Sequence, residues 1–175
     1  MITQQLLNPK SIVVVGGSNN IEKPGGKILK NIIDGDFQGE LYVSNPKYDE
    51  IQGVKSYRNP EDLPECDLAI IAIAAKYTPD VVKVLTEQKN TKAFIIISAG
   101  FSEESDEGAR LEEKVVELAD KAGASLIGPN CVGILTPSHH SIFTKPIPEL
   151  DPKGVDFISG SGATACFIME AGIPK

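Results

Sequence analysis

Short, nearly continuous apolar runs that alternate with helical patterns constrain the fold of this 175-residue chain more than any other feature. These runs do not alternate with polar residues, and a strand that is apolar on both faces is typical of the interior of a parallel sheet covered by helices. The predicted strands are residues 11–15, 41–43, 68–73, 94–97 and 125–127, with a possible short strand at Val54.

Helical periodicity fills the segments between these runs. Apolar residues recur at helical spacing over 28–33 and stop at Gly35, which predicts the end of a first helix. Thr78 and Pro79 predict the start of a second helix, with Thr78 as its N-cap and Pro79 in the first helical position.

A third helix is predicted to begin near Ser102, with Glu103 and Glu104 in its first turn, and to end at Gly123. Strands and helices in this order indicate an α/β fold. We therefore expect a Rossmann-like open parallel sheet over residues 1–135.

The end of the chain has a different character. Residues 136–152 hold four prolines and are predicted to form a linker. A strand at 155–158 and a helix over 163–171 are expected to follow it. One β-α unit cannot bury both faces by itself, so residues 153–175 are predicted to be the truncated start of a second domain.

The composition excludes several classes of protein. The net charge is −7 and the lysines and arginines do not cluster, which argues against a nucleic-acid partner. The apolar runs are far shorter than the ~20 residues of a membrane span, and the first segment has no signal-peptide pattern. Both features predict a cytoplasmic protein with no membrane partner. Three cysteines without CxxC spacing predict neither a disulfide framework nor a zinc site. His139 and His140 are expected to be an exposed pair on the linker, with no metal site.

Ligands of an open parallel sheet bind outside the carboxyl ends of its strands. The segments that leave those ends are rich in small and polar residues, and they carry Lys23, Lys47 and Lys76. The first of them, residues 16–26, is a glycine-rich loop before a helix, where backbone N–H groups suit a phosphate. A tight strand-to-helix connection without a ligand is the alternative.

The second strand discriminates between nucleotide cofactors. An NAD site presents an acidic residue there, whereas this chain has Ser44 and Lys47. A hydroxyl and a cation attract a phosphorylated ribose, which favours NADP or the 3′-phosphate of coenzyme A. The alternative is an exposed turn made by Asn45 and Pro46.

Several stretches together resemble a known family, the N-terminal CoA-binding domain of the NDP-forming acyl-CoA synthetases. This family includes the ADP-forming acetyl-CoA synthetases and the α-subunit of succinyl-CoA synthetase. The stretches that carry the resemblance are residues 8–16, 44–47, 97–101 and 128–133. Residues 157–162 are similar to the phosphate loop that opens the family's second, flavodoxin-like ligase domain.

The resemblance implies a reaction for the complete enzyme: acyl-CoA, ADP and phosphate give the free acid, ATP and CoA, through a phosphohistidine. ATP, ADP and Mg²⁺ would bind only in that complete enzyme. The implied partners are CoA or acyl-CoA and the remaining synthetase domains or an ATP-grasp subunit, with a homo-oligomer possible. The family's phosphohistidine lies beyond Lys175, so this chain alone is expected to bind CoA without turnover.

The resemblance also implies the site residues. Ser18 and residues 23–25 would face the CoA phosphates, and Ser44 and Lys47 the adenosine ribose and its 3′-phosphate. No catalytic residue and no metal ligand is predicted, and Cys131 is expected to pack beside the CoA tail. The implied CoA-binding residues are Gly16, Ser18, Asn19, Lys23, Gly25, Ser44, Asn45, Pro46, Lys47, Ala74, Ala75, Lys76, Ser98, Ala99, Gly100, Phe101, Asn130 and Cys131, and the implied phosphate loop is Ser159, Gly160, Ser161 and Gly162.

Two other functions stay open at this point. One is a non-catalytic CoA-sensing module, such as the synthetase-like regulatory part of a protein acetyltransferase. The other is an NAD(P)-binding redox sensor or dehydrogenase, which the missing acidic residue after the second strand disfavours.

Overall fold

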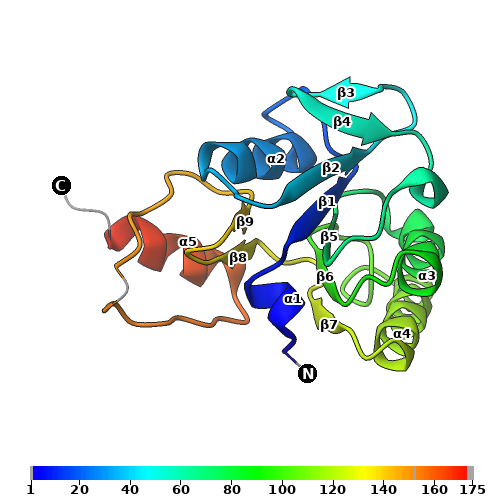
Figure 1. The fold of residues 1–175 in the computed structure, drawn as a ribbon. Coiled ribbons are helices and arrows are strands. Elements are labelled where there is room, and N and C mark those ends of the chain that lie inside the picture. The colour runs from blue at the N-terminus through cyan, green and yellow to red at the C-terminus, as the bar shows by residue number, and fades with distance from the viewer. Residues whose placement is uncertain (1, 152, 173–175) are drawn as a thin grey trace.

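The computed structural model describes residues 2–151 and 153–172, and in these ranges the main element is a seven-stranded sheet (Figure 1). Its strand order is β3-β4-β2-β1-β5-β6-β7, and every neighbouring pair is parallel except β3 and β4. The bounds are β1 (Ser11–Val15), β2 (Glu40–Ser44), β3 (Glu50–Ile51), β4 (Val54–Tyr57), β5 (Leu68–Ile71), β6 (Ala93–Ile96) and β7 (Ser125–Ile127).

The strand order reverses beside β1. The chain runs from β1 to one side through β2 and β4, then returns to pair β5 with the other side of β1. This arrangement confirms the predicted Rossmann-like open sheet and places a topological switch point between β1 and β5.

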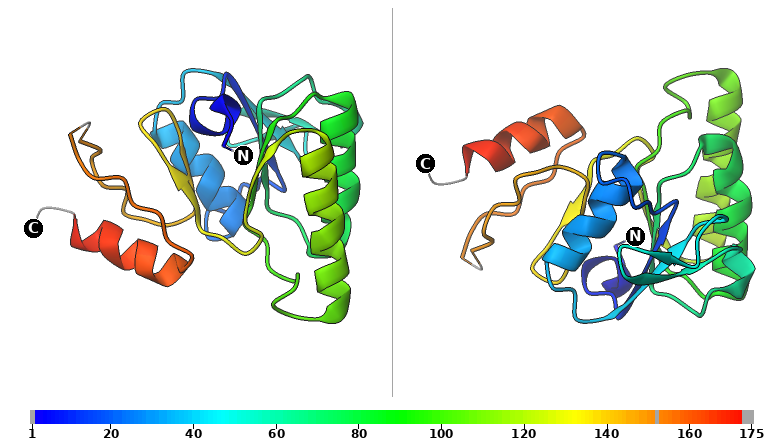
Figure 2. Two further views of the ribbon diagram at one scale, coloured as in Figure 1. Left: turned by 90° about the horizontal axis from the view of Figure 1, so that it is seen from below. Right: turned by 90° about the horizontal axis from the view of Figure 1, so that it is seen from above.

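Helices cover both faces of the sheet. Helix α2 (Pro24–Asp34) lies on one face, and α3 (Thr78–Gln88) and α4 (Asp106–Lys121) lie together on the other (Figure 2). None of the helices in the described ranges is long and apolar enough to cross a membrane. The shorter elements are α1 (Gln4–Leu7), the 3-10 turns η1 (Pro60–Asp62) and η2 (Ala75–Tyr77), α5 (Gly162–Ala171), and the strand pair β8 (Gly133–Leu135) and β9 (His140–Ile142).

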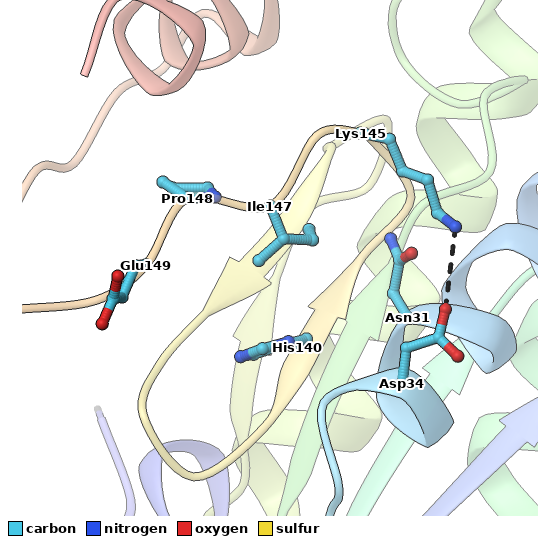
Figure 3. Close-up of a pocket in the computed structure, with 7 residues that line it drawn as sticks. All are labelled: Asn31, Asp34, His140, Lys145, Ile147, Pro148 and Glu149. Atoms are coloured by element: carbon cyan, nitrogen blue, oxygen red, sulfur yellow. Dashed lines mark ion pairs between the residues drawn. The ribbon is translucent and has the colours of Figure 1, made fainter. Parts of the chain in front are cut away.

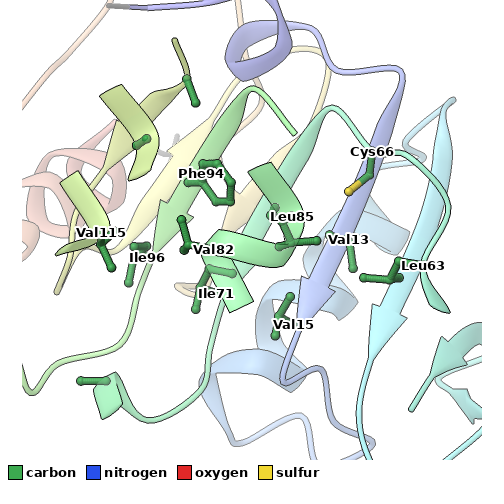
Figure 4. Close-up of a cluster of buried hydrophobic side chains, with 14 of the residues drawn as sticks. Val13, Val15, Leu63, Cys66, Ile71, Val82, Leu85, Phe94, Ile96 and Val115 are labelled. Carbon is green, nitrogen blue, oxygen red and sulfur yellow. The ribbon is translucent and has the colours of Figure 1, made fainter. Parts of the chain in front are cut away.

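Successive side chains of each strand enter opposite faces of the sheet. Val13 and Val15 pack with Leu85 under α3 and α4 (Figure 4), whereas Ile12 and Val14 pack under α2. All four of these β1 side chains are at most 3% exposed. Burial on both faces is the physical reason why the strands are continuous apolar runs.

The helix boundaries confirm part of the prediction and correct part of it. Gly35 follows the last residue of α2, and Gly123, with φ +64°, closes the turn after α4. Helix α3 begins one residue earlier than predicted, because η2 leads into it and makes Tyr77 its N-cap.

The predicted start of α4 near Ser102 is wrong. The N-cap is Ser105, whose Oγ accepts a hydrogen bond of 3.0 Å from the N–H of Gly108. Glu103 lies before the helix, where its carboxylate accepts the N–H of Gly100 at 2.8 Å. A loop contact therefore uses the acidic residue that the sequence analysis assigned to the first helical turn.

The histidine pair is not exposed, which corrects the prediction. His139 is 1% exposed: its Nε2 donates to the carbonyl of Leu6 at 2.9 Å, and its Nδ1 lies 2.7 Å from Oγ of Ser141. His140 begins β9, which packs against α2. Both ring nitrogens of His139 find partners in the protein, so the imidazole can be buried without metal.

The strand predicted at 155–158 does not form, since these residues have no regular secondary structure. Val155 is 96% exposed and Ile158 is 91% exposed. A strand needs a hydrogen-bonded neighbour. The helix predicted at 163–171 is present as α5, with Ser161 as its N-cap. The division of the chain into residues 1–135, a linker and a second domain stays a prediction.

Candidate functional site

The predicted ligand segments meet at the carboxyl edge of the sheet. Backbone hydrogen bonds continue past the strand ends and join one segment to the next, so the edge is a continuous, ordered surface. These bonds run from the N–H of Gly16 to Ser44 O (2.9 Å), Ala72 to Val15 O (2.8 Å), Ile97 to Ile71 O (3.1 Å) and Asn130 to Ser98 O (3.0 Å).

The glycines of loop 16–26 allow the backbone to pack closely at the switch point. Gly16 has φ +85°, and a Cβ there would lie 2.5 Å from the carbonyl oxygen of Ala72 on the β5 side. A Cβ on Gly25 would lie 2.3 Å from the carbonyl oxygen of Gly16. The first turn of α2 is thus held directly against the ends of β1 and β5, where only glycine fits.

The same loop presents an uncompensated helix N-terminus. Lys23 is the N-cap of α2, makes no side-chain capping bond, and the first turn holds no acidic residue. In the described part of the chain, the N–H groups of Asn19 and Gly25 have no protein acceptor. Free N–H groups, the positive end of the helix dipole and a nearby lysine suit an anionic ligand such as a phosphate.

After β2, the side chains divide between structural and exposed roles. Asn45 is structural: its Nδ2 donates to the carbonyl of Gly17 at 2.9 Å, and its Oδ1 accepts the N–H of Lys47 at 2.9 Å. Ser44 is 5% exposed, whereas Pro46 and Lys47 are exposed. Lys47 makes no ion pair with the described residues, and Asn45 ties its turn to the glycine loop.

The segments after β5 and β6 supply mainly backbone. Phe101 is completely buried in the core under α4 and Ala75 is 8% exposed, so the side chain of Phe101 does not reach the edge. Ala74 and Ala99 are exposed, and the Lys76 ammonium lies 4.8 Å from the ring centroid of Tyr77.

Gly100, which lies between Ala99 and Phe101, has φ +102°. Its N–H donates to Glu103, and this bond lowers the pKa of the Glu103 carboxyl. That N–H is therefore already occupied by a protein acceptor.

Cys131 packs at the edge, and no described basic residue bonds to it. Its Sγ lies 3.3 Å from the carbonyl of Ile96, and burial raises the pKa of its thiol. The geometry agrees with a packing role rather than a nucleophilic one. Cys66 is 4% exposed, and Cys166 on α5 is half-buried. Asn130, with φ +54°, makes the tight turn before Cys131.

Sequence reasoning missed Gln52, at the turn between β3 and β4. Its Nε2 donates to the carbonyls of Ser18 (2.7 Å) and Gly26 (3.0 Å), and its backbone N–H donates to Oδ1 of Asn19 (2.8 Å). The residue pair Gln52-Gly53 is a turn signal, but nothing in the sequence indicates that this turn reaches the glycine loop.

A hollow of about 400 Å³ lies elsewhere, between the second half of α2 and the segment around β9 (Figure 3). Its lining includes Asn31, Asp34, His140 and Lys145, none of which belongs to the predicted site. The described residues contain no cluster of His, Cys, Asp and Glu that could hold a metal ion.

Comparison with known proteins identifies the family of this domain. Residues 10–137 match the family described as "CoA binding domain". The chain is 39% identical over 164 residues to the acetate–CoA ligase (ADP-forming) II subunit alpha of Pyrococcus furiosus, covering 93% of this chain and 35% of the relative. It is 41% identical over 169 residues to the acetate–CoA ligase (ADP-forming) of Methanocaldococcus jannaschii, covering 93% of this chain and 22% of the relative.

Solved structures show the same relationship. A Pyrococcus horikoshii OT3 protein superposes with a TM-score of 0.88 at 38% identity, over 98% of this chain and 39% of that one. The dinucleotide-forming acetyl-coenzyme A synthetase 1 of Ca. Korarchaeum cryptofilum, solved with phosphate and ADP, gives 0.86 at 31% identity, over 97% and 36%.

This chain therefore spans between about a fifth and two fifths of the length of these four proteins. The part that it matches is their N-terminal CoA-binding portion. The family and the similarity to CoA ligases support coenzyme A as the bound ligand. With a family match over more than half of its residues, the chain belongs to the CoA binding domain family.

Proposed function

We propose that this chain is the CoA-binding portion of an ADP-forming acyl-CoA synthetase, and that by itself it binds CoA or acyl-CoA without turnover. The observation that carries the proposal is the switch-point edge, where loop 16–26 has N–H groups without an acceptor among the described residues. Asn45 ties this loop to the turn that holds the exposed Lys47. CoA carries a pyrophosphate and a 3′-phosphate. The N–H groups of the loop offer a partner for the pyrophosphate, and Lys47 offers one for the 3′-phosphate.

The phosphates of CoA would be bound by the glycine loop. The N–H groups of Asn19 and Gly25, with Ser18 and Lys23, would face the pyrophosphate, and Gly16 lets the backbone approach it. Ser44 and Lys47 would face the adenosine ribose and its 3′-phosphate. A charge-assisted contact between an ammonium group and a phosphate is worth roughly twice a neutral hydrogen bond.

The rest of the cofactor would lie against small residues. The adenine and pantetheine would pass the exposed Ala74 and Ala99, and Lys76 would border this path. The backbone of residues 98–101 would contact the pantetheine, and the thiol would emerge beside Asn130 and Cys131.

In the complete enzyme the chemistry would be acyl-CoA, ADP and phosphate to free acid, ATP and CoA. None of the described basic residues lies beside Cys131 to make it a nucleophile. This chain's part would therefore be to hold the CoA thiol in place. Phosphoryl transfer would belong to the remaining synthetase domains or to an ATP-grasp subunit, which are the proposed partners.

The C-terminal residues support a start of a second domain within 153–175. Val155, Ile158 and Phe167 are all more than two thirds exposed, so this unit has apolar surface that a further part of the enzyme would cover. Ser161 caps α5 by accepting the N–H of Thr164 at 3.3 Å, and Gly160 is exposed. Residues 159–162 stay our candidate for its phosphate loop.

Calorimetry with CoA and with dephospho-CoA, which lacks the 3′-phosphate, tests the proposal. Lys47→Glu should weaken CoA binding by about tenfold or more, since it replaces a charge-assisted contact with repulsion. The same variant should leave dephospho-CoA binding nearly unchanged.

Lys10→Glu is the matched control, because Lys10 is exposed but precedes β1 and so lies at the opposite edge of the sheet. It should not change either affinity. If the wild-type chain fails to bind CoA, the proposed function is wrong. If Lys47→Glu weakens both ligands equally, the assignment of the 3′-phosphate is wrong.

A further inference from the structure

We infer that Gln52, at the tip of the β3–β4 hairpin, is a positioning residue that holds the phosphate-binding loop in its binding conformation. The inference rests on the proposed CoA site and adds to it a residue from outside the carboxyl-edge segments. Gln52 follows β3, which is antiparallel to its neighbour and contributes no ligand segment to the edge.

The contacts of Gln52 join the two ends of the loop. One amide group donates to Ser18, near the start of the loop, and to Gly26, in the first turn of α2, at 2.7 and 3.0 Å. Its backbone N–H adds a third bond, to the side chain of Asn19. A loop rich in glycine has much conformational freedom to lose, and these bonds remove it before a ligand arrives.

The bond to Ser18 also sets the direction of a donor. A trans peptide is planar, so its carbonyl and the following N–H point in opposite directions. With the Ser18 carbonyl held toward Gln52, the N–H of Asn19 is directed away from the hairpin, and it has no acceptor in the part of the chain that the structure describes. Rotation of this peptide would instead present a carbonyl oxygen where a phosphate needs a donor.

Gln52 acts on the loop and not on the ligand. Its Oε1 is buried without a hydrogen-bond partner among the described residues, and the Nε2 is used twice by loop carbonyls. Gln52 has φ +51° and precedes Gly53, with φ +80°, so the hairpin turn holds the side chain at this position.

Two variants separate positioning from folding. Gln52→Leu keeps most of the side-chain volume but removes both donors. Gln52→Asn keeps an amide and suits a positive φ, but it is one methylene too short to reach both carbonyls. The matched control is Gln38→Leu, because the exposed Gln38 donates to the carbonyl of Asp36 at 2.7 Å, away from the glycine loop.

Calorimetry should show that both Gln52 variants weaken CoA and dephospho-CoA by the same factor, about tenfold for two lost hydrogen bonds. Gln52→Asn should do so with a smaller fall in melting temperature than Gln52→Leu, because it keeps a polar amide beside the two carbonyls, and Gln38→Leu should change neither affinity. In ¹⁵N-labelled protein, the amide signal of Asn19 should differ between wild type and Gln52→Asn before any ligand is added.

The outcomes distinguish this inference from the proposed function. No CoA binding by the wild type overturns both. If the wild type binds CoA, Lys47→Glu weakens this binding and neither Gln52 variant changes it, only the positioning role is overturned. Weakening only in Gln52→Leu, together with a lower melting temperature, also overturns it, because the role is then structural.

Discussion

The side-chain amide of Asn45 donates a 2.9 Å hydrogen bond to the carbonyl of Gly17, and so ties the turn after β2 to the loop after β1. The other end of the same amide accepts the N–H of Lys47. One side chain thus sets the relative position of the two segments that we assign to the CoA phosphates.

Replacing Asn45 with Ala should lower the free energy of unfolding by about 1–2 kcal/mol, because a partly buried carbonyl loses its donor. Urea denaturation measures this change. Asn59→Ala is the control, since Asn59 makes an exposed 2.9 Å bond to Asp62, and it should alter stability by less than about 0.5 kcal/mol. Equal effects of the two substitutions would contradict the structural role of Asn45.

Replacing Gly25 with Ala should displace the first turn of α2. The new Cβ would lie 2.3 Å from the carbonyl oxygen of Gly16, and a backbone atom cannot yield as a flexible side chain can. We expect a loss of about 1–3 kcal/mol in stability, which thermal melting measures. CoA binding should also be weaker, which calorimetry measures. In Gly160→Ala, where the Cβ meets nothing within 4 Å, both quantities should stay as in the wild type.

Stability should fall as the pH falls below about 6.5, the ordinary pKa of imidazole. Burial lowers the pKa of His139 in the folded protein. Below pH 6.5 the unfolded chain therefore binds a proton that the folded chain does not bind. The stability that is present above pH 6.5 is lost as the pH falls toward the folded pKa. Burial lowers the pKa of His140 as well, and it adds in the same direction.

Urea denaturation between pH 5 and 8 checks this. His139→Gln retains a donor for the Leu6 carbonyl but does not titrate, so it should flatten the pH dependence. His140→Gln is the companion variant and should flatten it less, because His140 is less buried. An unchanged slope in His139→Gln would show that another group carries the pH dependence.

The three thiols should be alkylated at different rates. Burial raises the pKa of Cys66 to about 11, so at pH 8 only about one molecule in a thousand would hold the reactive thiolate. Cys131 also has a raised pKa, and Cys166 is half-buried on α5. Iodoacetamide labelling followed by mass spectrometry should give the order Cys166, then Cys131, then Cys66. Fast labelling of Cys131 would argue against its packing role.

The sheet could be predicted because its strands are buried on both faces, and this leaves a continuous apolar signature. Short elements that depend on contacts with distant residues were predicted poorly. The sequence did not reveal α1, β8 or β9, which form because distant residues meet: His139 bonds to Leu6, and Asn31 of α2 donates to the carbonyl of Ile142 in β9.

The predicted strand at 155–158 shows the opposite case. Its residues favour a strand, but none of the described residues pairs with them. The segments that carry the predicted CoA-binding residues do lie at one edge, because parallel strands carry their loops to a common side. Local pattern could not distinguish Phe101, whose side chain is in the core, from the exposed Ala99 two residues earlier.

The sequence by itself determined the α/β class and the resemblance to CoA-binding synthetase domains, because periodicity and short motifs are local properties of the chain. It also predicted the edge at which a ligand would bind. Only the tertiary structure decided that Gln52 contacts the glycine loop and that His139 is buried. Hydrogen bonds between residues 26 to 133 positions apart depend on how the elements pack, and no local pattern of residues encodes that packing.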